Sequence, residues 1–72
     1  MAKARIKELR FEISVLANRL DNDMEEAEYN ALVDKINGLI AEYHDARFER
    51  MLQRGEVMNR AEYDKNYGVY KW

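Results

Sequence analysis

The chain has 72 residues, no cysteine, no proline, a charged fraction of 36% and a formal net charge of −2. A chain this short forms one domain and buries only about 60% of its unfolded surface, and without cysteine it has neither disulfides nor thiolate metal sites. No apolar run is long enough for a membrane-spanning helix, and the basic first ten residues lack the apolar stretch of a signal peptide. We therefore expect one cytoplasmic domain, residues 1–72, without contact to a membrane.

The first predicted element is a helix over residues 2–20. Its apolar residues recur at spacings of four and three, which is the 3.5-residue average of coiled-coil packing. The polar sequence "DND" at residues 21–23 favours a turn and can cap the helix that follows. The apolar stripe consists of Ala2, Ile6, Leu9, Ile13, Leu16 and Leu20.

A longer helix is predicted over residues 24–54. The pair Asn37–Gly38 is a strong turn signal, but the apolar register passes through it without a shift, so we predict one continuous helix. Gly55 is expected to end the helix, because glycine readily adopts the conformation of a C-terminal cap. The apolar stripe consists of Tyr29, Leu32, Val33, Ile36, Leu39, Ile40, Tyr43 and Ala46.

A short third helix is predicted over residues 59–67, followed by a tail over residues 68–72. Asn59 and Glu62 have the spacing of a capping box, with asparagine in place of serine or threonine. The three elements together predict an all-α fold. Its architecture is an antiparallel helical hairpin with a long second helix and a short C-terminal third helix.

The two long helices differ in length, so the end of the second extends beyond the first. This overhang is apolar, because it carries Phe48, Met51 and Leu52. Two alternatives remain open for what covers it. A second copy of the chain could do so, or the third helix could fold back. In that case the covering residues would be Val57, Tyr63 and Tyr67.

Phe11 and Val15 lie on the side of the first helix away from its apolar stripe, and the C-terminal segment has little apolar area to cover them. Exposed apolar clusters of this kind favour association. Gly38 lies opposite the stripe of the second helix, where a second chain could approach closely. We therefore predict a homodimer with Phe11, Val15 and Gly38 in its interface.

Residues for catalysis are scarce. Ser14 is the only serine and His44 the only histidine, and positions 40 and 48, one helical turn from His44, are Ile and Phe rather than metal ligands. We expect His44 to be a boundary residue that titrates near neutral pH. The sequence thus predicts no enzyme, no cofactor and no metal site.

Charge is sorted along the chain: residues 1–20 carry a net +3, residues 21–45 a net −7 and residues 46–72 a net +2. Arg47, Arg50 and Arg54 share one helix face and, with the aromatic residues of the tail, have the residue types that bind single-stranded nucleic acid. The acidic pI of 5.4 argues against that function, which remains an alternative.

The composition is similar in style to the small helical proteins of phages and mobile elements, many of which bind and block a host protein. We therefore predict a non-enzymatic protein–protein interaction module, an inhibitor or regulator of a host protein. The alternative of another class is a structural protein that assembles only with itself. Tyr, Trp and Arg dominate many interfaces, so the predicted partner-binding surface is the overhang with the tail. Its residues are Phe48, Met51, Leu52, Arg47, Arg50, Arg54, Tyr63, Tyr67, Tyr70 and Trp72.

Overall fold

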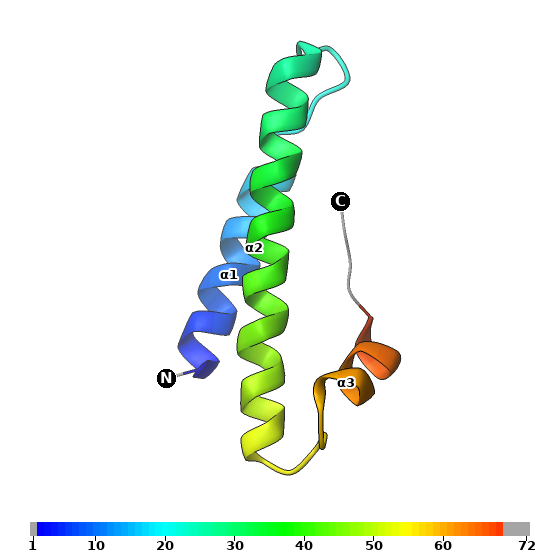
Figure 1. Ribbon diagram of the computed structural model, residues 1–72. Coiled ribbons are helices and arrows are strands. Elements are labelled where there is room, and N and C mark those ends of the chain that lie inside the picture. Colours follow the sequence, from blue (N-terminus) through cyan, green and yellow to red (C-terminus); the bar gives the residue numbers. More distant parts are fainter. Residues whose placement is uncertain (1, 69–72) are drawn as a thin grey trace.

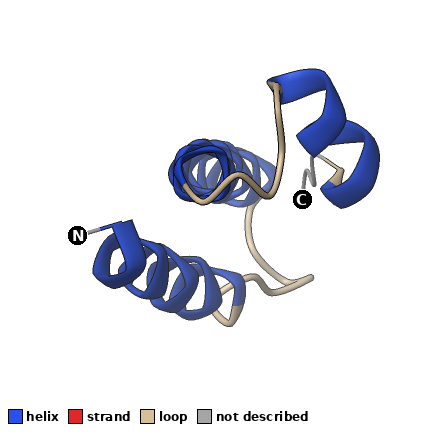
Figure 2. Ribbon diagram, turned by 90° about the horizontal axis from the view of Figure 1, so that it is seen from below, coloured by secondary structure: helices blue, strands red, loops and turns tan. Residues whose placement is uncertain are grey.

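The computed structural model describes residues 2–68, and the side chains of residues 4–68. This part of the chain contains three helices and no strand: α1 (Ala2–Ala17), α2 (Glu26–Gln53) and α3 (Arg60–Tyr67). α1 and α2 run antiparallel, and α3 lies beside the C-terminal half of α2 (Figures 1 and 2). The predicted all-α hairpin with a long second helix is therefore confirmed.

The core of the hairpin is formed by the two predicted apolar stripes. Leu16 of α1 and Ile36 and Ile40 of α2 are buried together. The repeat of 3.5 residues keeps these side chains on one face of each helix, so the two faces meet along the hairpin. The half-buried residues around them are Ile13, Ala17, Leu20, Leu32 and Leu39.

The turn between α1 and α2 is longer than predicted, because α1 ends at Ala17 and not at Leu20. The N–H groups of Arg19 and Leu20 donate to the carbonyls three residues back, at 3.0 and 3.2 Å, which tightens the chain into a turn. Leu20 still packs against the core, so it reaches the interior from the turn and not from the helix.

The "DND" sequence stabilises this turn and does not cap α2. Asp21 Oδ1 accepts a hydrogen bond from the Asp23 N–H at 3.0 Å, which is the turn geometry that aspartate favours. α2 begins at Glu26, two residues later than predicted, and its N-cap Glu25 makes no capping bond through its side chain. The capping role expected for these residues is therefore wrong.

α2 continues through Asn37 and Gly38, as predicted, and ends at Gln53. Gly55 has φ +76°, and the Glu56 N–H donates to the Met51 carbonyl at 2.9 Å. This is the Schellman arrangement, in which glycine accepts the left-handed conformation without steric cost. Gly55 therefore ends α2 as the sequence predicts.

The predicted cap of α3 is also present. Asn59 Oδ1 accepts from the Glu62 N–H at 2.9 Å. Glu62 Oε2 in turn accepts from the Met58 N–H at 3.2 Å, one residue before the cap. The cap thus satisfies two backbone donors at the start of a helix of eight residues. Within residues 2–68, no helix is both long and apolar enough to cross a membrane.

Candidate interaction surfaces

The overhang of α2 is covered by α3 and the loop before it. Met51, Val57 and Tyr63 form a second buried cluster, with Phe48 and Tyr67 packed against it. The covering of the overhang by the third helix is thus the alternative that the structure supports. Because Met51 and Tyr63 are only 8% and 0% exposed, they are core residues and offer almost no surface to a partner. Leu52, by contrast, stays 43% exposed.

His44 is a core residue and not the boundary residue expected from the sequence. Its side chain is 1% exposed, and its Nδ1 lies 2.8 Å from the Tyr63 hydroxyl in a buried hydrogen bond. Burial lowers the pKa of His44, and the positive charges of Arg47 and Arg60 lower it further, against Asp64 and Asp45. The expected titration near pH 7 is therefore shifted downward, because α3 covers the edge of the stripe where His44 lies.

Arg60 fastens α3 to α2 through charge and stacking. Its guanidinium donates to Asp45 of α2 at 2.8 Å and to Asp64 of α3 at 3.0 Å. The same group lies 5.3 Å from the centroid of the Phe48 ring, within the range of a cation–π contact. The bond to Asp45 contributes most to the raised pKa of Arg60. The spacing of four residues between Arg60 and Asp64 is a sequence signal for their ion pair. The contact between Arg60 and Asp45 has no such signal, because the two residues are 15 positions apart.

Three arginines surround an open hollow of about 360 Å³ at the end of α2, which we call the arginine hollow. The Arg47 guanidinium lies 4.9 Å from the centroid of the Tyr67 ring, and Arg54 forms a 3.5 Å ion pair with Glu56. The structure thus brings together the predicted arginine face and one tail aromatic, while Tyr70 and Trp72 lie outside the described residues. The lining consists of Arg47, Arg50, Met51, Arg54, Glu56 and Tyr67.

The most exposed aromatic ring described is that of Phe11, whose side chain is 71% exposed, one turn from Val15 at 42%. The two residues line an open hollow of about 330 Å³, which we call the Phe11 groove, between α1 and α2. The lining consists of Phe11, Glu12, Val15, Leu16, Lys35 and Leu39. The predicted interface residue Gly38 is outside this lining, although it is exposed and neighbours Lys35 on the surface of α2.

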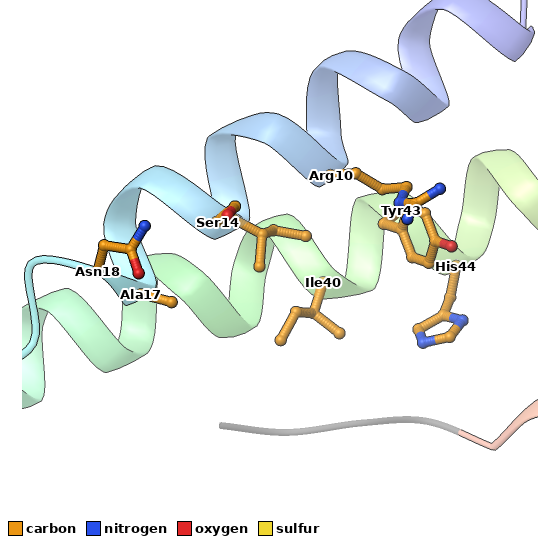
Figure 3. Close-up of a pocket in the computed structure, with 8 residues that line it drawn as sticks. Arg10, Ser14, Ala17, Asn18, Ile40, Tyr43 and His44 are labelled. Atoms are coloured by element: carbon orange, nitrogen blue, oxygen red, sulfur yellow. The ribbon is translucent and has the colours of Figure 1, made fainter.

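A third open hollow of about 400 Å³ lies between the two helices (Figure 3). Ser14 of α1 and His44 of α2 both line it, but the His44 ring points away from α1 (Figure 3). The ring is hydrogen-bonded to the Tyr63 hydroxyl. A serine nucleophile needs its base within hydrogen-bond reach, and this arrangement does not provide it. The full lining is Arg10, Ile13, Ser14, Ala17, Asn18, Ile40, Tyr43 and His44.

Among residues 2–68, no three or more His, Asp or Glu side chains are grouped so that they could hold a metal ion. Comparisons with protein-family models, with curated protein sequences and with solved structures find no match to this chain.

Proposed function

We propose that this protein is a small, non-enzymatic protein–protein interaction module that binds through the Phe11 groove. The observation that carries the proposal is the pair Phe11 and Val15, which are 71% and 42% exposed beside a hollow of about 330 Å³. An aromatic side chain buries about 150–250 Å² on association and dominates many interfaces. Neither side chain is needed to fill the core of the hairpin.

The shape of the groove favours a helical segment as its occupant. It lies between two antiparallel helices and has an apolar floor of Leu16 and Leu39, with Glu12 and Lys35 as charged lining residues. An amphipathic helix binds such a groove with its apolar face. The two charges of opposite sign would favour one orientation of the bound helix.

A more specific form of the proposal is an inhibitor or regulator, encoded by a phage or mobile element, that binds a host protein in the cytoplasm. The arginine hollow would then be a second contact, suited to acidic groups of the same target. The exposed Leu52 at the same end of α2 adds apolar area. Fractionation of cells that express the tagged protein tests the location.

Affinity purification from the natural host tests the proposal. We expect the double variant Phe11→Ala with Val15→Ala to lose the proteins that the wild type retains. The matched control is Met58→Ala, which removes an apolar side chain that is 82% exposed outside the groove. A double variant that is folded by circular dichroism and retains every partner would contradict the proposal.

Nucleic-acid binding is the second candidate function, and the arginine hollow favours it, because three arginines line it against one acidic residue, Glu56. Phosphate contacts give an affinity that falls steeply with salt. We would measure single-stranded DNA and RNA binding at low and high salt for the wild type and for Arg50→Ala with Arg54→Ala. The absence of binding at low salt would exclude this candidate.

A further inference from the structure

The Phe11 groove lies at the middle of the molecule and continues to one end. Leu39, which lines it, is at the centre of the 28 residues of α2. A neighbouring hollow of about 490 Å³ shares Leu16 and Lys35 with the groove and extends to the turn between α1 and α2. The two hollows are therefore adjacent and together extend from the centre of the hairpin to the turn, and we call them the channel. The extension is lined by Leu16, Arg19, Asp21, Met24, Glu28, Ala31, Leu32 and Lys35.

The end that this channel reaches is acidic. Residues 21–28 contain five acidic and no basic side chains. Asp21 and Glu28 line the extension together with Arg19 and Lys35, so the acidic excess lies on the turn and not along the lining. An occupant that follows the channel toward the turn therefore needs basic groups at its leading end and an apolar ring at the centre.

α1 itself has these properties on its outer surface. Phe11 is exposed there, and Lys7 and Arg10 line a shallow hollow with it on the side toward the N-terminus. Arg5 is not counted among these groups, because it forms ion pairs with Glu8 and with Glu42 of α2. The outer surface of α1 thus presents an apolar ring with two basic groups on its N-terminal side, which complements the groove and the acidic turn.

We propose that the occupant of the Phe11 groove is a second copy of this chain in antiparallel orientation. A twofold axis between Phe11 and Val15 would place Phe11 of each copy in the groove of the other, because a twofold interface uses the same surface on both subunits. The basic half of each α1 would then follow the channel of the other copy to its acidic turn. A parallel arrangement would instead bring like charges together at both ends.

The size of the molecule allows such an interface. Its extents are 45 × 24 × 13 Å, so a broad face is large enough for the roughly 800 Å² per partner of a stable complex. This inference rests on the proposed role of the groove in protein binding and makes a second copy its occupant. A host protein would then have to displace that copy or bind at the arginine hollow. The proposed protein binding and the proposed dimer can fail separately, because a monomeric protein could still bind a host protein through Phe11.

Sedimentation equilibrium of the full chain at micromolar concentrations tests the association. We expect a dimer for the wild type, with a dissociation constant that rises with salt because the ends are charged. Phe11→Glu should raise this constant at least about a hundredfold, whereas Met58→Glu, at a position 82% exposed elsewhere, should leave it unchanged. Circular dichroism confirms that each variant is folded.

The orientation of the two copies is tested with a nitroxide spin label on the variant Asn22→Cys. The label attaches at this position alone, because the chain has no other cysteine. Labelled copies are mixed with unlabelled, nitrogen-15-enriched copies, and amide broadening is measured only in the latter. Broadening at residues 4–10 supports the antiparallel dimer, and broadening around residue 22 overturns it. A monomer at all concentrations, or a dimer that Phe11→Glu does not weaken, overturns the second copy as occupant. Loss of a host partner on the same substitution would then still support the proposed function.

Discussion

The two ends of α2 are packed in different ways. Along α1, the buried residues are all apolar: Leu9 and Leu16 of α1, and Ile36 and Ile40 of α2. Beside α3, the packing includes a buried hydrogen bond between His44 and Tyr63 and an arginine bound to two aspartates. The first kind of contact depends on spacing alone and tolerates many sequences. The second depends on individual partners. We therefore expect single substitutions to disturb the packing of α3 selectively, whereas the hairpin core should tolerate them better.

Tyr63→Ala should have the largest effect. Tyr63 is fully buried and contacts His44, Phe48 and Tyr67 through its ring or hydroxyl. Loss of a buried aromatic ring costs about 3–5 kcal/mol, and Tyr63 is the only buried residue of α3. We expect α3 to detach while the amide of Ile36 stays protected in hydrogen exchange.

Tyr63→Phe is the matched control, because it keeps the ring and removes only the hydroxyl bonded to His44. Its cost should be about 1–3 kcal/mol, and α3 should stay docked. If Tyr63→Ala unfolds the whole chain in one transition, the two ends of α2 are not independent.

Acid should weaken the α3 end before the hairpin. The pKa of His44 is lowered from its ordinary value of 6.5 by burial and by the neighbouring arginines. Below pH 6.5 the unfolded chain therefore binds a proton that the folded chain does not. The His44 contribution to stability is complete above pH 6.5 and decreases below it, by at most about 1.4 kcal/mol per pH unit.

Hydrogen exchange between pH 8 and pH 5, corrected for the intrinsic rate, measures this effect separately for the two ends. Amides of α3 should lose protection, while that of Ile36 should change little. Equal losses at both ends would mean that His44 does not link α3 docking to pH.

Asn59→Ala should have a smaller effect. Asn59 accepts from the Glu62 N–H at 2.9 Å and caps α3, so its removal should cost about 1 kcal/mol. Thermal unfolding of the wild type, Asn59→Ala and Asn59→Ser measures this cost. The serine variant retains a capping oxygen and should lie close to the wild type. An alanine variant equal to the serine variant would show that the cap does not stabilise α3.

Gly38→Ala should act on the hairpin with the opposite sign. A Cβ at Gly38 would meet no atom within 4 Å, so alanine should stabilise α2 by about 1 kcal/mol. Urea unfolding in a Phe11→Glu background measures this gain. Weaker dimerisation of Gly38→Ala alone would support the predicted close approach at this position, and unchanged dimerisation would place Gly38 outside the interface.

The difference between the two ends also explains which features were predictable from the sequence. The apolar spacings of Leu16 and Ile36 specify the hairpin, and Gly55 and Asn59 specify local caps. The boundary of α1 was not predictable in this way, because Leu20 reaches the core from a turn. The burial of His44 depends on Tyr63, 19 residues away, and local periodicity carries no information on such a pairing. The sequence indicates that the three arginines share one helix face, but it does not indicate that Arg47 stacks on the Tyr67 ring.

We infer that the Phe11 groove is an interaction surface and that a second copy of the chain occupies it. A dilution series followed by two-dimensional NMR tests this most directly in the unmodified protein. Amide signals of Phe11, Val15, Lys35 and Leu39 should shift as dimers dissociate, and that of Met58 should not. Spectra that are independent of concentration, with a monomeric rotational correlation time throughout, would contradict the claim.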